Sequence, residues 1–284
     1  MLKFHLIKRQ LITLKLIMKI KRIVNKVLAK TNINIQEKTN KTEVLRLIER
    51  LHPKKTIKPL IRMGPSGDGG YLLPDDLENI EACFSPGVDQ ISGFEEDCSK
   101  AGMKLFLADK SVDFPPINLP AEKFDFIKKF IGFTQNDDYI TMDEWVKLAN
   151  LKENSDLLLQ MDIEGFEYFT FINMTISLQK RFRIIVIELH SLHKLWEEEF
   201  YNLASAALGK ILETHTCVHI HPNNCCGLDK KKGIETARLA EFTFLRNDRG
   251  ILDEFQTSFP HPLDFDCTSR PSLILSEDWY HSSK

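Results

Sequence analysis

The feature that most constrains this chain is a short apolar run that ends abruptly in acids. Residues 157–161, Leu-Leu-Leu-Gln-Met, are long enough for one buried strand, and Asp162-Ile-Glu164-Gly165-Phe-Glu167 follows at once. Residues 183–190 repeat the design, because an apolar run there ends in Glu188-Leu-His190. Ligands of open α/β sheets bind beyond the carboxyl ends of the strands. The two runs therefore predict neighbouring parallel strands with a polar site at their ends. A strand followed by a helix whose first turn carries acids is the simpler alternative.

A β-loop-α-β unit is predicted earlier in the chain. Residues 80–85 and 104–108 have strand character, and Ser92 and Glu95 have capping-box spacing at the start of a helix that runs to Lys100. Asp109 ends the second strand, 22 positions after Gly87 in the intervening turn. A similar interval separates a nucleotide-binding turn from the acid that holds a ribose hydroxyl.

The turn after the first of these strands narrows the choice of ligand. It reads Ser85-Pro-Gly87-Val-Asp89 and is not a GxGxxG turn, so it lacks the backbone geometry expected around a pyrophosphate. A ligand with a ribose and no phosphates, such as S-adenosylmethionine, fits better. The alternative is an ordinary βαβ unit with a surface aspartate.

A glycine-rich loop, Gly67-Asp68-Gly69-Gly70, lies upstream of this unit. Its glycines indicate positive φ angles or a close approach by another group. A tight hairpin explains the loop without any ligand. Asp68 is the polar group on the loop, and we count it among the candidate cofactor-binding residues.

Charge divides the chain into an N-terminal extension and an acidic body. Residues 1–30 contain nine basic residues and no acidic one, and the remainder has a net charge of about −11. An acidic body argues against a nucleic-acid-binding protein. The first 35 residues have the pattern of a basic amphipathic helix, which would lie on an anionic membrane surface or pack on its own domain or a partner. Their apolar runs are too short for a membrane span.

The rest of the chain is predicted to contain a connecting region and one large domain. Residues 36–60 have the pattern of a polar linker and a short helix, Glu43–Leu51, with Thr39 or Thr42 as its cap. Residues 61–284 form the main domain, and its patternless C-terminal tail is expected to cap the sheet. The six cysteines fit neither a disulfide framework nor a zinc site. We therefore expect reduced thiols and a cytoplasmic location, with Cys225-Cys226 as a loop feature.

Three stretches together resemble the FkbM-type methyltransferases. They are Tyr139-Ile-Thr-Met-Asp-Glu-Trp, the run ending in Asp162-Ile-Glu-Gly-Phe-Glu, and Ile-Val-Ile-Glu188, within a similarity that spans roughly residues 60–246. The resemblance implies a Rossmann-like class I fold, with a mostly parallel seven-stranded sheet and helices on both faces. It also implies S-adenosylmethionine as cofactor and O-methylation of a sugar, a glycan or a related metabolite.

The resemblance further implies roles for individual residues. Asp162 would lie between cofactor and acceptor, and Asp109 would hold the ribose. The remaining cofactor contacts would be Phe84, Ser85, Gly87 and Asp89 at the methionine end and Asp137 or Asp138 at the adenine.

Methyl transfer to a hydroxyl also needs a group that removes the hydroxyl proton. The candidates are Asp162, Glu164, Glu188, His190 and His221. Histidine has the most suitable pKa at neutral pH, which favours His190 or His221, although each could be a structural histidine instead. A second hypothesis is that Mg²⁺ or Mn²⁺ activates the hydroxyl. Its ligands would be Asp162, Glu188, His190, His221 and Asn223.

A function of another class remains open. A methyltransferase-like fold without catalysis could bind a partner or glycan, tethered by its basic N-terminus. An NAD-dependent oxidoreductase is disfavoured by the missing GxGxxG turn. A glycosyltransferase is disfavoured because no DxD stretch ends a predicted strand.

Overall fold

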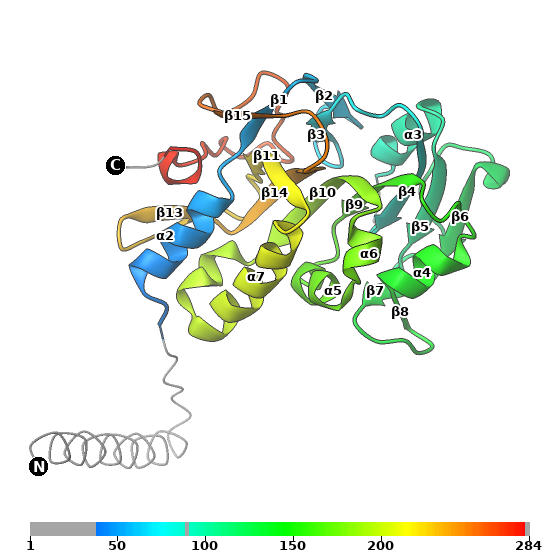
Figure 1. The fold of residues 1–284 in the computed structure, drawn as a ribbon, viewed down its shortest axis with the longest axis horizontal. Coiled ribbons are helices and arrows are strands. Elements are labelled where there is room, and N and C mark those ends of the chain that lie inside the picture. Colours follow the sequence, from blue (N-terminus) through cyan, green and yellow to red (C-terminus); the bar gives the residue numbers. More distant parts are fainter. Residues whose placement is uncertain (1–37, 89–90, 282–284) are drawn as a thin grey trace, which may run out of the picture. The chain divides into compact units, whose positions relative to one another are not determined.

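A seven-stranded sheet dominates the computed structural model, which describes residues 38–88 and 91–281 (Figure 1). The strands run in the order β11-β14-β10-β9-β4-β5-β6. All neighbours in this order are parallel except the pairs made by β14, which lies antiparallel to both β10 and β11. In chain order the strands are β4 (Ile80–Pro86), β5 (Lys104–Ala108), β6 (Phe124–Ile127), β9 (Asp156–Met161), β10 (Phe182–His190), β11 (His215–Pro222) and β14 (Leu239–Arg246). The predicted fold class is confirmed.

Each face of the sheet has its own core, as the alternation along β10 shows. Ile185 and Ile187 pack with the helices on one face, while Ile184 and Val186 pack on the other. The first face is covered by α2 (Lys41–Arg50), α4 (Met142–Leu148), α5 (Glu167–Asn173), α6 (Ile176–Gln179) and α7 (Glu198–Ile211). The second is covered by α3 (Gly93–Lys100) and by a hairpin of β2 (Leu60–Met63) and β3 (Tyr71–Pro74). Strands buried on both faces explain the nearly continuous apolar runs in the sequence.

Short elements complete the domain. They are the pairs β1 (Lys54–Thr56) with β15 (Ile251–Phe255), β7 (Phe130–Gly132) with β8 (Tyr139–Thr141) and β12 (Leu228–Lys231) with β13 (Ile234–Ala237), and the 3₁₀ helices η1 (Ala121–Lys123), η2 (Leu192–Trp196) and η3 (Glu277–Trp279). The C-terminal tail packs its Leu275 and Trp279 into the helix-side core. The tail therefore belongs to the domain.

The helix caps differ in part from the sequence expectations. Asn40, rather than Thr39 or Thr42, caps α2, because its side chain accepts a hydrogen bond from the Glu43 N–H. Thr141 caps α4, because its side chain accepts a hydrogen bond from the Glu144 N–H. The predicted capping box at Ser92 is wrong, because Ser92 makes no side-chain cap bond and Glu95 is buried beside Ser85 instead.

Residues 39–284 form one compact unit that includes α2 and β1, so the stretch expected as a linker packs on the main domain. The predicted amphipathic helix over residues 1–35 lies outside the described residues. Among the helices that the structure describes, none has the length and apolarity that crossing a bilayer requires.

Candidate active site

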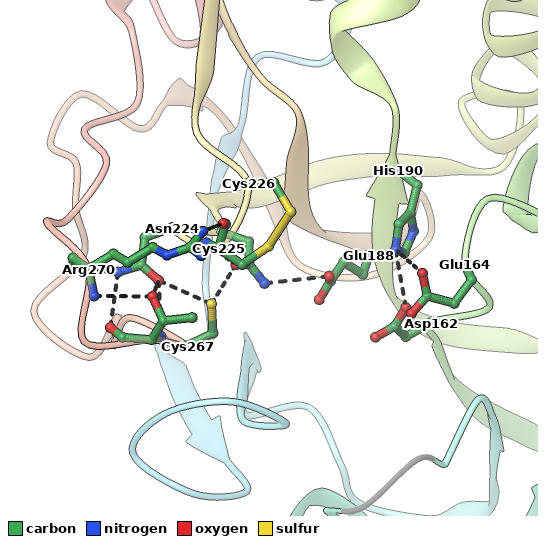
Figure 2. Close-up of a disulfide and its surroundings, with 11 residues drawn as sticks. Asp162, Glu164, Glu188, His190, Asn224, Cys225, Cys226, Cys267 and Arg270 are labelled. Atoms are coloured by element: carbon green, nitrogen blue, oxygen red, sulfur yellow. Dashed lines mark hydrogen bonds and ion pairs between the residues drawn. A yellow bond between two sulfur atoms is a disulfide. The ribbon is translucent and has the colours of Figure 1, made fainter.

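The carboxyl ends of β9 and β10 bring three side chains together. Ile187 on β10 lies opposite Met161 on β9, so Asp162, which follows β9, lies near the end of β10. One ligand atom each from Asp162, Glu188 and His190 lies within 4.8 Å of the others. Figure 2 shows these side chains beside one another, with Glu164 pointing toward His190. The convergence predicted from the two apolar runs is therefore present.

A tight turn connects β9 to α5 and places a further acid against His190. Glu164 and Gly165 both have positive φ angles, 56° and 99°. The turn is closed by Glu167, whose Oε1 accepts hydrogen bonds from the N–H groups of Ile163 and Gly165, both at 3.0 Å. The same oxygen lies 3.1 Å from His190 Nδ1. The sequence suggested only the backbone contacts of Glu167 and missed its pairing with His190.

The other ring nitrogen of His190 faces the polar site. Nε2 lies 3.3 Å from Glu164 Oε2 and 3.8 Å from Asp162 Oδ1. Burial lowers the pKa of His190, but the hydrogen bond with Glu167 and the nearby carboxylates outweigh it and raise the pKa above its ordinary value. Burial raises the pKa of Asp162 to about 7, opposed by His190 and reinforced by the neighbouring acids. Asp162 and His190 can therefore hold or release a proton near neutral pH.

Glu188 extends the acidic group toward the antiparallel strand. It is buried, and burial together with the charges of Asp162 and Glu241 raises its pKa well above the ordinary value. Glu241 lies directly opposite on β14, and burial raises its pKa to about 8. Two acids side by side on adjacent strands repel each other when both are charged. Sequence reasoning missed Glu241, because a single acid inside an apolar strand gives no sign of its neighbours.

Two cavities meet at Asp162. The first, of about 380 Å³, is lined by Asp109 and Ser111 on one side and by the rings of Phe130, Tyr139 and Phe166 on the other. Asp109 is fixed there, because its carboxylate accepts hydrogen bonds from the Val88 N–H and from Ser111.

The second cavity, of about 360 Å³, lies under the glycine-rich loop. Its polar lining includes Asp68, Glu95 and Gln160. Gly87 and Asp162 line both cavities, so they form the wall between them. The loop is thus the turn of a hairpin, as the simpler interpretation held, and it also carries Asp68 to the cavity.

Several predicted cofactor contacts lie away from both cavities. Phe84 is fully buried and stacks on Phe106, and Ser85 is fully buried against Glu95, so neither side chain lines either cavity. A cofactor contact by either residue stays a prediction. Asp137 and Asp138 are exposed and line neither cavity, and Asp138 pairs with Lys110. Asp89 lies outside the described residues.

Two of the predicted metal ligands, His221 and Asn223, are engaged by other groups. His221 and His219 both lie beside Asp264 of the tail, at 3.5 and 2.8 Å respectively. Asn223 donates its amide N–H to Glu188 Oε1 at 3.4 Å, while its oxygen accepts from the Cys225 N–H and from Cys267. Its oxygen is thus engaged away from the acidic group. The candidate cation ligands reduce to Asp162, Glu188 and His190.

The loop after β11 contains a disulfide between adjacent residues, Cys225 and Cys226 (Figure 2). The expectation of reduced thiols is therefore wrong for this pair. It holds for Cys83, Cys98, Cys217 and Cys267, which are free. Whether two adjacent cysteines form a disulfide depends on the conformation of their loop, which cysteine spacing alone does not predict.

Comparison with known proteins agrees with the geometry of the site. Residues 104–211 match the family model of the methyltransferase FkbM domain. This segment runs from β5 to α7 and contains Asp109, Asp162, Glu188 and His190. No curated protein matches the chain. Residues 104–211 are therefore similar to an FkbM methyltransferase domain, and this match supports an S-adenosylmethionine-dependent methyltransferase.

Proposed function

We propose that this protein transfers the methyl group of S-adenosylmethionine to a hydroxyl of a sugar, a glycan or a related small metabolite. The observation that carries the proposal is the position of Asp162, at the wall between two cavities and beside His190. A hydroxyl at this wall would have acids and an imidazole within reach. The methyl donor, S-adenosylmethionine, would lie along the two cavities.

The residues of both cavities fit the cofactor. In the first, Asp109 suits a ribose diol, and the rings of Phe130, Tyr139 and Phe166 suit an adenine. In the second, the acids Asp68 and Glu95 suit the ammonium group of the methionine end. Gly87, which borders both cavities, packs directly against the Asp162 backbone, where any side chain would clash.

The chain contributes alignment and a proton acceptor to the transfer. The carbon–sulfur bond breaks as the acceptor oxygen bonds the methyl carbon, and the hydroxyl proton must leave. His190 Nε2 faces the site and would accept that proton, while Asp162 would orient the hydroxyl. His221 is a weaker candidate for the base, because it is buried beside Asp264. Holding the oxygen in line with the methyl is the larger contribution of the site.

A divalent cation is the second candidate for activating the hydroxyl. The three ligand atoms of Asp162, Glu188 and His190, within 4.8 Å of one another, favour it. Two carboxylates and an imidazole suit Mg²⁺ or Mn²⁺, which would supply Lewis acidity to a bound hydroxyl. His190 cannot accept a proton through Nε2 while Nε2 binds a cation, so the two mechanisms are alternatives.

The charges of the site favour an uncharged, hydroxyl-rich acceptor. Asp162, Glu188 and Glu241 lie at the end of β10, where burial and the repulsion of neighbouring acids raise the pKa of all three, so this position disfavours a further negative charge on the acceptor. The nine basic residues among the first thirty support contact with an anionic membrane surface, which would bring a cytoplasmic enzyme near lipid-linked glycans.

Incubation with methyl-labelled S-adenosylmethionine and a panel of neutral sugars and glycans tests the proposal. We expect label in at least one acceptor, and a loss of at least about 100-fold in Asp162→Ala. Asp253→Asn is a matched control, because Asp253 is fully exposed and pairs only with Lys54 on the surface. Wild-type activity in Asp162→Ala would refute this placement of the site. Calorimetry without S-adenosylmethionine binding would favour a non-catalytic binding module.

A further inference from the structure

Glu167 is a buried carboxylate that joins the turn after β9 to His190 on β10. It is the first residue of α5 and is fully buried. Its Oε1 has three neighbours at hydrogen-bond distance: the N–H groups of Ile163 and Gly165, and His190 Nδ1. The two backbone donors fix this oxygen in place, so it is a rigid acceptor for the imidazole.

The position of this oxygen selects one tautomer of His190. Oε1 already accepts from two backbone N–H groups and therefore acts as an acceptor, so Nδ1 must donate its proton to it. In the neutral ring Nε2 then has a free lone pair, and this nitrogen faces Asp162 and Glu164. The backbone under the ring is held too, because the Tyr168 hydroxyl donates to the His190 carbonyl at 2.8 Å.

We propose that Glu167 is a positioning residue that holds His190 with its proton on Nδ1 and its Nε2 lone pair directed into the acceptor site. The catalytic consequence rests on the proposed methyl transfer. The positioning itself does not, because the same orientation serves Nε2 as a proton acceptor or as a cation ligand.

A pair of substitutions separates the hydrogen bond from the shape of the side chain. Glu167→Met is close in shape and has no strong acceptor. Glu167→Gln keeps an oxygen that can accept from Nδ1. We expect kcat to fall about 100-fold in Glu167→Met, with little change in the KM of the acceptor, and to be largely restored in Glu167→Gln. Combined with His190→Ala, Glu167→Met should lower kcat no further. A residue that only stabilises the turn would lower it further.

Nitrogen NMR of the imidazole gives a readout that needs no activity. In the full-length wild-type protein without substrate, at a pH above the pKa of His190, we expect a protonated Nδ1 and an unprotonated Nε2, with the signal assigned by its loss in His190→Ala. Glu167→Met should move the proton to Nε2 or mix the two forms. If Glu167→Met does not fold, Glu167→Asp takes its place, because it withdraws the carboxylate by about 1.5 Å.

The two measurements distinguish this inference from the proposed function. An altered tautomer in a protein that methylates no acceptor would support the positioning role and count against the function. An unchanged Nδ1–H tautomer in the folded variant would overturn the positioning role, whatever the activity. Additive losses from Glu167→Met and His190→Ala would overturn it as well.

Discussion

Gly87 packs against the backbone of Asp162 so closely that a Cβ at Gly87 would lie 1.5 Å from the Asp162 carbonyl oxygen. The contact is reinforced by a hydrogen bond from the Asp162 N–H to the carbonyl of Pro86 at 3.2 Å. The turn after β4 therefore sets the position of the turn after β9. The two cavities that Gly87 and Asp162 both line therefore share one rigid wall at this point.

Gly87→Ala should therefore destabilise the protein and weaken S-adenosylmethionine binding by at least tenfold. Gly102→Ala is the matched control, because Gly102 has a similar φ of 90° and nothing within 4 Å of the added Cβ. The control should lose about 1–2 kcal/mol of unfolding free energy through backbone strain alone. Urea unfolding and calorimetry measure the two effects. Equal losses in both variants would show that the contact with Asp162 is unimportant.

Asp109→Ala should raise the Kd for S-adenosylmethionine by about 10- to 100-fold. The substitution removes a charged acceptor for a ribose and the bonds that hold the Val88 N–H and Ser111. Asp113→Ala is a suitable control, because Asp113 is almost fully exposed and pairs with Lys128. An Asp109 variant that binds like wild type would place the ribose elsewhere.

Exhaustive chelation decides between the two modes of hydroxyl activation. If His190 is the base, activity should change less than about twofold on dialysis against a chelator, because no step then needs a cation. An activity that disappears and returns with Mg²⁺ or Mn²⁺ would establish the cation mechanism. In that case Glu188→Gln should weaken the metal's apparent affinity as well as the rate.

The stability of the fold should fall as the pH drops from 6.5 toward 4, in part because of His215. This histidine is fully buried between Thr214 and the Phe182 carbonyl, and burial lowers its pKa to about 4. Its folded pKa lies below the unfolded value of about 6.5, so the unfolded chain binds the proton more readily. The contribution is present above pH ~6.5 and disappears by pH ~4, and it amounts to about 3 kcal/mol at most.

Urea unfolding at pH 7 and pH 5 measures this effect. We expect wild type to lose about 2 kcal/mol more between these pH values than His215→Gln does. The titration of the other groups affects both proteins, so it cancels when the two losses of unfolding free energy are subtracted. The same loss in both proteins would mean that another group causes the pH dependence.

The sequence predicted those parts of the structure that depend on local pattern. The strand at residues 104–108 was expected with its observed bounds, since an apolar run between turn residues defines a buried strand. Asp162, Glu188 and His190 were expected to converge, because the carboxyl ends of parallel neighbours share one edge of the sheet.

The parts of the site that the sequence did not predict depend on long-range strand pairing and on the direction of side chains. Glu241 reaches the site because β14 inserts antiparallel between β10 and β11, and no local pattern in the sequence specifies that partner. Asp264 lies beside His219 and His221, but it belongs to the C-terminal tail, whose sequence has no periodicity from which its position could be predicted. Asn223 was expected to offer an oxygen, but the loop disulfide region and Cys267 engage that oxygen and turn the amide nitrogen toward Glu188.

The boundaries of the family match have a consequence for how the protein is built. β4 lies outside residues 104–211, yet it is the strand between β9 and β5, so the matched segment lacks the middle of its own sheet. Glu241, Asn223 and Asp264, which approach the acceptor side, all come from the chain after residue 211. The site is thus built from residues inside the matched segment, such as Asp162 and His190, and from residues on both sides of it. A protein that resembles this chain over residues 104–211 alone therefore need not share the rest of its site.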